Sequence, residues 1–140
     1  LSNDKKIFNK INSSVFPGQQ GGSISNNIVA KYISFKEANN FNFVNYTKQI
    51  LINSKIMLKT FLYRGYKSLF NETINHMFLI NIKEKCSLLI EKILEKNGIL
   101  LNRNFFPNDF KSSKNPSAIR IGLSSITTRK MKKIEVELLA

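Results

Sequence analysis

Hydrophobic residues recur at helical spacing in the first part of the chain, and this pattern predicts two helices before residue 40. The first is short: Ile7, Phe8 and Ile11 fall at roughly helical spacing, and the polar residues 2–4 can cap it. The second covers 26–38 and is apolar over much of its circumference. Such a pattern is typical of a helix that is packed inside a larger domain.

A longer helix is predicted over residues 42–64, where apolar residues fall seven positions apart. Phe43, Ile50 and Met57 form one such row, and residues at this spacing stay on one face of a helix. Asn42 is the predicted N-cap, and Gly65 suits a left-handed turn after the last helical residue. We expect a scaffold helix that carries no chemistry.

Beyond residue 65, short apolar runs surround one further helix. Ser87 is predicted to cap this helix and Gly98 to close it, and another helix is predicted from Met131 onward. Strand–strand–helix–strand order favours an α/β class of fold, with a small α+β layer in which helices cover a sheet. The predicted strands cover 66–70, 77–82, 99–102 and 118–121.

The segment 15–22 (VFPGQQGG) is a glycine-rich turn that leads into the predicted helix 26–38. Gly21 and Gly22 lack Cβ atoms, so their backbone N–H groups are open to close approach and positive φ is accessible. A turn of this kind before a helix N-terminus suits a bound phosphate. Its spacing fits neither a Walker loop nor a dinucleotide fingerprint. A plain turn and an anion-binding turn both remain open.

A formal net charge of +13 is typical of proteins that bind nucleic acid or anionic membranes. The lysines, however, are scattered along the chain, and no aromatic residues stand at the positions of a nucleic-acid module. A basic nucleic-acid-binding domain is therefore kept only as an alternative. The apolar runs are too short to cross a bilayer, so no membrane partner is expected.

At 140 residues the chain has the size of one domain, and its cysteine and histidine content narrows the chemistry. The single Cys86 excludes an internal disulfide and favours a reducing compartment, so we predict a cytoplasmic location and an inert thiol. His76 is the only histidine, which excludes a site built from several histidines. No metal site is expected.

Arg120 is the strongest side-chain candidate for binding a ligand. It lies in the apolar run 119–122 (IRIG), where a guanidinium requires a counter-anion if it is buried. A planar fork held on a strand suits bidentate binding of a carboxylate. The residue pattern alone leaves a solvent-facing arginine on an edge strand equally open.

Short segments match one family in order along the chain: 12–22 (NSSVFPGQQGG), 30–31 (AK), 35–38 (FKEA), 64–67 (RGYK), 75–76 (NH), 102–104 (NRN), 107–109 (PND), 119–122 (IRIG) and 127–129 (TTR). Through these segments the chain resembles serine hydroxymethyltransferase, a family of fold-type-I pyridoxal-phosphate enzymes. The resemblance covers nearly the whole chain and corresponds to the C-terminal part of the family.

The resemblance implies a domain division and two anion contacts. Residues 1–40 would be the end of the large cofactor domain, and 41–140 the connecting helix and most of the small C-terminal domain. Arg120 matches the arginine that holds the carboxylate of serine or glycine. Gly21 and Gly22 match the paired glycines whose amides reach the phosphate of pyridoxal 5'-phosphate in the neighbouring subunit, which implies a homodimer with shared sites.

The resemblance also implies contacts to tetrahydrofolate, the cosubstrate of the family. Phe16 matches a phenylalanine that flanks the folate, and Asn104 matches an asparagine that hydrogen-bonds the pterin. Ser112 and Ser113 fall in the loop that closes over the folate, although this loop diverges from the family pattern.

Parts of the family pattern are missing. Ser23 replaces a proline, Ala118 a glycine and Lys130 another glycine. The Schiff-base lysine and the residues that hold the cofactor ring precede this segment in the family, so no catalytic residue is predicted here and the segment alone is expected to be inactive. A complementing N-terminal fragment is therefore a second possible partner, and a degenerate, non-catalytic binding or scaffold subunit is the alternative function.

Overall fold

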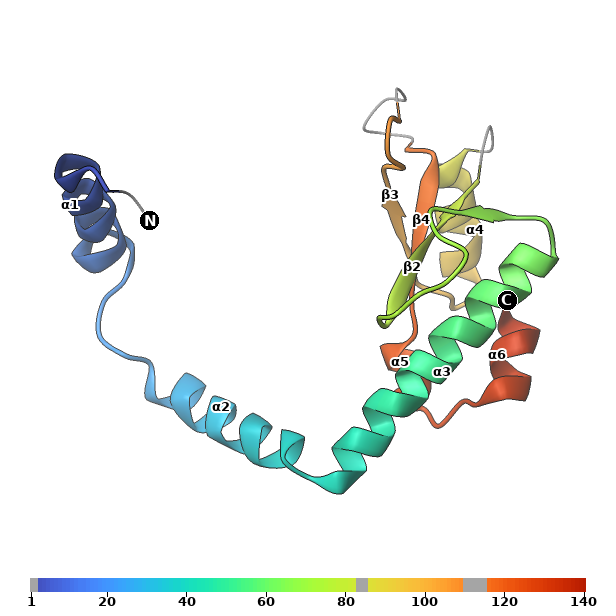
Figure 1. Cartoon of the computed structure of the whole chain (residues 1–140), viewed down its shortest axis with the longest axis horizontal. Coiled ribbons are helices and arrows are strands. Elements are labelled where there is room, and N and C mark those ends of the chain that lie inside the picture. The colour runs from blue at the N-terminus through green and yellow to red at the C-terminus, as the bar shows by residue number, and fades with distance from the viewer. Residues whose placement is uncertain (1–2, 83–85, 110–115) are drawn as a thin grey trace. The chain divides into compact units, whose positions relative to one another are not determined.

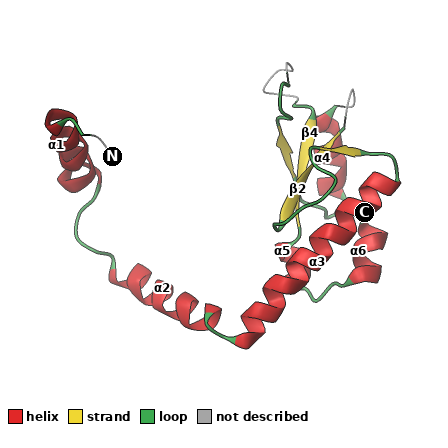
Figure 2. Cartoon of the chain, viewed as in Figure 1, coloured by secondary structure: helices red, strands yellow, loops and turns green. Residues whose placement is uncertain are grey.

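The computed structural model describes residues 3–82, 86–109 and 116–140. The chain divides into two units, Leu1–Asn40 and Phe41–Ala140, and each is described by itself. The elements along the chain are drawn in Figures 1 and 2. They are α1 (Lys5–Ser13), η1 (Ser14–Gln19), α2 (Ser25–Ala38), α3 (Phe41–Tyr63), β1 (Lys67–Ser68), β2 (Met77–Asn81), α4 (Ser87–Lys96), β3 (Asn102–Asn104), β4 (Ala118–Gly122), α5 (Ser124–Thr128) and α6 (Lys133–Leu139).

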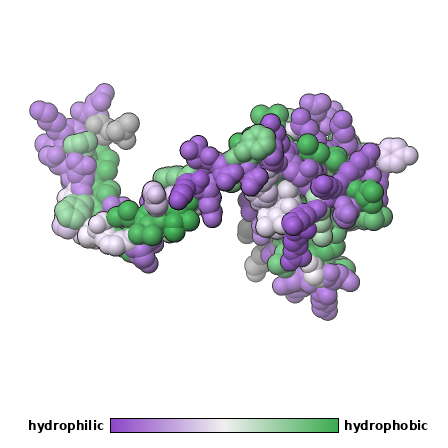
Figure 3. Space-filling view, turned by 90° about the horizontal axis from the view of Figure 1, so that it is seen from below, coloured by the Kyte–Doolittle hydropathy of each residue, from purple (hydrophilic) through white to green (hydrophobic). Residues whose placement is uncertain are grey.

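The first unit consists of helical segments without a core of their own. The predicted cap of α1 is confirmed, because Asp4 Oδ1 accepts a hydrogen bond of 2.8 Å from the Lys6 N–H. The helix predicted over 26–38 is also confirmed as α2. All residues from 3 to 40 are exposed, and apolar side chains gather on the surface of the α2 stretch (Figure 3). The apolar circumference of α2 is therefore not covered within this unit.

Helix α3 is the long helix that the sevenfold spacing predicts. It begins at Phe41, so the prediction of Asn42 as N-cap is wrong. The reason is that the turn at 39–40 already separates α3 from α2, and the Asn40 N–H bonds back to Glu37 O at 3.1 Å. The predicted end is confirmed: Gly65 has φ +84°, and the Tyr66 N–H donates to Phe61 O at 3.0 Å.

Replacing Gly65 with alanine is expected to lower the free energy of unfolding by about 1 kcal/mol, because a Cβ is strained at positive φ. Gly122 is the matched control, since it lies outside the positive-φ range and a Cβ there meets no atom within 4 Å. Chemical denaturation of both variants measures the difference. Equal losses at the two positions would contradict the strained turn.

The second unit contains an antiparallel sheet with strand order β1-β2-β4-β3. The sequence predicts β2 and β4 within one residue, but the prediction of a strand at 99–102 is wrong, because strand pairing covers Asn102–Asn104 instead. The Ile99 N–H bonds back to Leu94 O at 2.9 Å and so belongs to the end of α4. The strand predicted over 66–70 shortens to β1, since the Tyr66 N–H closes α3 instead of pairing.

Helix α3 packs against β1 and β2 and helix α4 against β3, α6 packs on α3, and the core lies between these elements. This arrangement confirms the α+β layer. Helix α5 was not predicted, and α6 begins at Lys133 instead of Met131 because the Met131 N–H bonds back to Ile126 O at 3.1 Å. The buried cluster comprises Met57 and Leu58 of α3, Phe78 and Ile80 of β2, Ile82, Ile119 of β4, Leu123, and Val136 of α6.

A buried amide joins α3 to the C-terminal helices. Asn53 is fully buried, and its Nδ2 donates to Thr127 Oγ1 and to Met131 O, both at 2.9 Å. Its Oδ1 accepts from Gln49 Nε2 at 2.8 Å. Because a buried amide is costly without partners, these bonds fix where the α5–α6 segment sits on α3.

Candidate functional site

Arg120 lies at the centre of β4, which pairs with a strand on each side. Its register partners are Leu79 on β2 and Asn102 on β3. Side chains alternate along a strand and paired residues share a face, so Arg120 points away from the face on which Ile119 is buried. The predicted strand is confirmed, and it is an inner strand of the sheet. Arg120 itself is exposed, and its binding role stays a prediction.

A cavity of about 390 Å³ opens beside Arg120. This volume falls in the range of small-molecule sites, roughly 300–1,000 Å³. The connection between β1 and β2 forms one wall and contributes Glu72, while β2 contributes Met77 and Leu79. The guanidinium therefore borders a cavity that holds one acidic and several apolar side chains.

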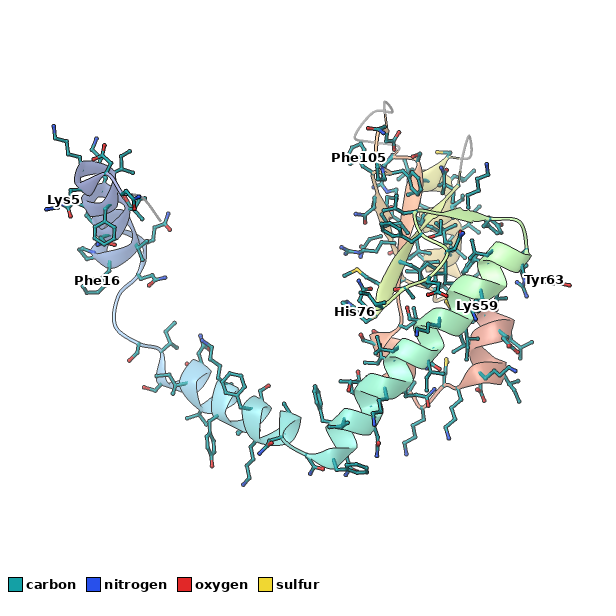
Figure 4. All side chains as sticks on the ribbon, in the orientation of Figure 1. Lys5, Phe16, Lys59, Tyr63, His76 and Phe105 are labelled. Atoms are coloured by element: carbon teal, nitrogen blue, oxygen red, sulfur yellow. The ribbon has the colours of Figure 1, made fainter. Side chains whose placement is uncertain are left out.

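The β1–β2 connection is held by hydrogen bonds within itself. Thr73 is buried, and its Oγ1 donates to Met77 O at 3.0 Å. Asn75 Oδ1 accepts from the Met77 N–H at 2.9 Å. His76, labelled in Figure 4 at the start of β2, is exposed, and its carbonyl accepts from the Leu123 N–H at 2.9 Å. These bonds hold the β1–β2 connection, which lines the cavity together with Arg120.

Asn104 lies on β3, on the same face of the sheet as Arg120. Its register partner is Ala118, two residues before Arg120. Asn104 is half-buried and lines a second cavity of about 250 Å³, to which Phe105 also contributes. The neighbouring Arg103 points to the helix-bearing face, where its Nε pairs with Glu91 Oε2 of α4 at 2.6 Å.

The glycine turn lies in the first unit, together with Phe16. No heavy atom lies within 4 Å of the place where a Cβ would stand on Gly21 or Gly22, so both backbones are open to approach. Positive φ occurs at Gly65 and Gly98 and not at these two residues. Phe16, which is labelled in Figure 4, has an extended backbone. Its side chain is 63% exposed.

The N-terminus of α2 follows this turn directly. Ile24 occupies the N-cap and makes no side-chain cap bond, and no acidic residue stands in the first turn. The first N–H groups of a helix attract anions when no side chain satisfies them. The open glycines and this helix end together suit a phosphate group.

Other predicted residues are placed only in part. Ser112 and Ser113 lie outside the described residues. Asp109 and Ser117 flank that segment, and Asp109 Oδ2 accepts from the Ser117 N–H at 2.6 Å. Cys86 is exposed. Within the described residues, no group of three or more His, Cys, Asp or Glu side chains is arranged to hold a metal ion, and no helix is long and apolar enough to span a membrane.

Glu72 is the residue of this site that the sequence did not single out. It stands in a short polar stretch between two strands, which is typical of a solvated turn. Asn102 was missed as the neighbour of Arg120, because the sequence does not show which residues of two strands pair. Only the register of β3 against β4 reveals that pairing.

Comparison with known proteins gives one consistent family. The family model described as serine hydroxymethyltransferase matches residues 2–140. A serine hydroxymethyltransferase of Buchnera aphidicola subsp. Acyrthosiphon pisum (strain 5A) is 45% identical over 135 residues, which cover 95% of this chain and 32% of the relative.

Two further relatives agree with this match. The serine hydroxymethyltransferase of Metamycoplasma arthritidis is 38% identical, covering 100% of this chain and 34% of the relative. That of Idiomarina loihiensis is 40% identical, covering 99% and 34%. The chain thus spans about a third of the length of the curated relatives it matches. By this match along nearly all its residues, the chain belongs to the serine hydroxymethyltransferase family.

Proposed function

We propose that residues 1–140 supply the C-terminal part of a serine hydroxymethyltransferase, which interconverts serine and glycine and transfers a one-carbon unit to tetrahydrofolate. The observation that carries this proposal is Arg120, held on an inner strand beside a cavity of about 390 Å³. Its family and its position on the sheet both favour a carboxylate ligand.

Arg120 binds and orients the amino acid in this proposal. A guanidinium makes two parallel hydrogen bonds to a carboxylate, which fix both the position and the plane of the bound group. Strand β4 carries Arg120 and pairs with β2 on one side and β3 on the other, which limits movement of its backbone. Holding the substrate in one orientation lowers the entropic part of the barrier for a reaction at the adjacent carbon.

Gly21, Gly22 and the N-terminus of α2 fit the phosphate of pyridoxal 5'-phosphate. Their open backbone and the uncapped helix end offer N–H donors to an anion, and no acidic residue of the first turn opposes it. When bound, the cofactor acts as the electron sink for carbanion chemistry. The proposal includes the family arrangement in which these amides reach the phosphate held by a second subunit.

Asn104 and Phe16 are proposed to contact tetrahydrofolate. The amide of Asn104 borders the cavity of about 250 Å³ and can donate and accept hydrogen bonds, as recognition of a pterin requires. Phe16 offers an exposed ring for stacking. Ser112 and Ser113 are proposed to belong to the loop over the folate.

The two units are proposed to belong to different domains of the whole enzyme. Unit 1, the end of the large cofactor domain in this proposal, buries none of its described residues, whereas unit 2 has the core of a small domain. The apolar surface of α2 supports packing against polypeptide outside residues 1–140. We place the enzyme in the cytoplasm, with a homodimer as its working form. The 140 residues alone are expected to be inactive, because no cofactor-bearing lysine is assigned among them.

A chimaera tests this function directly. The matching third of the Buchnera relative is replaced by residues 1–140, and glycine formation from serine is measured with tetrahydrofolate present. We expect a cofactor-bearing enzyme that forms glycine, since the chain has residues at the positions matched to the substrate, cofactor and folate contacts of the family.

Each failure of the chimaera identifies a different error. An enzyme that holds pyridoxal 5'-phosphate, seen by its absorbance, and makes no glycine would contradict the assigned activity. A folded chimaera that holds no cofactor would contradict the fit at Gly21 and Gly22. The relative with its own C-terminal third is the control for assay and assembly.

A further inference from the structure

Asn97 and Gly98 form the only Asn–Gly pair in the sequence, and they stand where α4 ends. Both residues are exposed, so water reaches them in the folded chain. We propose that Asn97 is a site of covalent modification, which deamidates to aspartate or isoaspartate when the last turn of α4 opens. The product in turn destabilises that turn.

The reaction requires only these two residues and water. The Gly98 nitrogen loses its proton to water or hydroxide and attacks Cγ of Asn97, which forms a cyclic succinimide. The bond between Cγ and Nδ2 breaks, and ammonia leaves. Water then opens the ring at Cγ, which gives aspartate, or at the backbone carbonyl, which gives isoaspartate. Glycine favours the first step, because it has no side chain to hinder the attacking nitrogen.

The folded end of α4 blocks this first step. Asn97 has ψ 13°, so the Gly98 nitrogen nearly eclipses the backbone nitrogen of Asn97 and lies away from its Cβ. Ring closure requires a rotation of ψ that brings the Gly98 nitrogen to the Cβ side. The Gly98 N–H also donates to Glu95 O at 3.0 Å, and Asn97 Nδ2 donates to Ile93 O at 2.8 Å. The two reacting groups are therefore held apart.

The last turn of α4 can open while the core stays packed. The buried cluster draws its helical residues from α3 and α6, and the Asn97–Gly98 pair lies outside it. The turn is closed by backbone hydrogen bonds, among them one of 2.9 Å from the Ile99 N–H to Leu94 O. Gly98 has φ +78°, the left-handed conformation of a helix C-terminus. Helix ends open at a fraction of the free energy of global unfolding, and deamidation proceeds from that open form.

The modification removes a donor from the end of α4. An oxygen replaces Asn97 Nδ2 and cannot donate to Ile93 O, and the new carboxylate adds negative charge at the C-terminal end of the helix dipole. Isoaspartate also inserts an additional carbon atom into the main chain between α4 and β3. Arg103 of β3 pairs with Glu91 of α4 at 2.6 Å, so this contact between strand and helix is expected to loosen.

The rates of deamidation in the folded chain and in guanidinium chloride test the site and its gate. Both samples are kept at the same mildly alkaline pH, and the peptide that contains Asn97 is followed by mass spectrometry. In denaturant, Asn97 is expected to react faster than every other asparagine, and in the folded chain at least about tenfold more slowly than in denaturant. Faster reaction of another asparagine in denaturant would overturn the site, and equal rates of Asn97 in the two states would overturn the gate.

Hydrogen exchange of the Gly98 amide measures the same opening independently. If the open form is the reactive one, the factor by which exchange is slowed should match the factor by which deamidation is slowed. A Gly98 amide that exchanges only as slowly as the amides of β2 would mean that α4 opens by global unfolding, which would overturn the local gate.

Two leucines of α4 provide matched variants. Leu94 is half-buried in the last turn, and Leu94→Ala is expected to speed deamidation of the folded chain by a factor of roughly three to ten. Leu89→Ala, at a position 57% exposed near the start of the same helix, should leave this rate unchanged. Neither variant should alter the rate in denaturant. Equal rates for the two folded variants would contradict the gate at the end of α4.

Asn97→Asp tests the consequence of the modification, because it introduces the charge of the product. Asn97→Ala removes the hydrogen bond without adding charge. The Gly98 amide should exchange faster in Asn97→Ala than in wild type and faster again in Asn97→Asp. Exchange in Asn97→Asp that is as slow as in wild type would overturn the destabilising effect of the product.

Discussion

Replacing Arg120 with alanine in the chimaera is expected to weaken glycine binding roughly 10- to 100-fold, the effect of losing a charge-assisted bidentate contact. Arg120 is exposed in the isolated chain, but it borders a cavity whose other walls are largely apolar. Without the Arg120 guanidinium, the described lining of this cavity offers the ligand carboxylate no other positively charged group. Equilibrium titration with glycine measures the loss.

Two matched variants support this prediction. Arg120→Lys keeps the charge but loses the planar fork, so its affinity should fall between those of wild type and Arg120→Ala. Lys92→Ala removes one positive charge from the exposed surface of α4 and should leave glycine affinity unchanged. Cofactor absorbance should be equal in all variants, and equal glycine affinity in Arg120→Ala and wild type would remove the assigned carboxylate contact.

Replacing Ile80 with alanine is expected to lower the free energy of unfolding of the chain by about 2–5 kcal/mol. Ile80 is 0% exposed on β2, an inner strand, and belongs to the cluster shared by the sheet and its helices. Truncation removes apolar contacts and leaves a cavity that close-packed neighbours fill only in part. Urea denaturation followed by circular dichroism measures the change.

Ile134 is the control for this variant. It lies on α6 and is 69% exposed, so Ile134→Ala should change the free energy by no more than about 0.5 kcal/mol. A loss at Ile80 no larger than that at Ile134 would show that the β2 face is not the core.

The helices were the most predictable part of the fold. The apolar spacing in α3 extends over several turns, and Gly65 marks its end by a conformation that glycine adopts without strain. The start of α3 was missed because a turn in the preceding residues, not the side chain of Asn42, separates it from α2. A capping residue is therefore a weaker predictor of where a helix begins than a long apolar face is of the helix itself.

The strands were predictable only where packing dominates. β2 and β4 are apolar runs whose alternate residues reach the core, and both were found. β3 consists of polar residues, so its pairing depends on β4 and not on local pattern. The residues predicted as its beginning instead close α4, through a backbone bond that no periodicity reports.

Some residues of the candidate site could be predicted from the sequence and others could not. Arg120 stands out in sequence because a cation within an apolar strand is unusual. Glu72 does not, since its place in the same cavity lining as Arg120 depends on how the β1–β2 connection folds. The buried Asn53 was missed for the same reason: its partners lie more than 70 residues away along the chain.

A crystal structure of the chimaera with glycine bound would show which residue holds the carboxylate of the amino acid. We predict the glycine carboxylate on the guanidinium of Arg120, with two N···O distances of about 2.7–2.9 Å. A glycine carboxylate held by another residue, with the Arg120 side chain in solvent, would contradict the account.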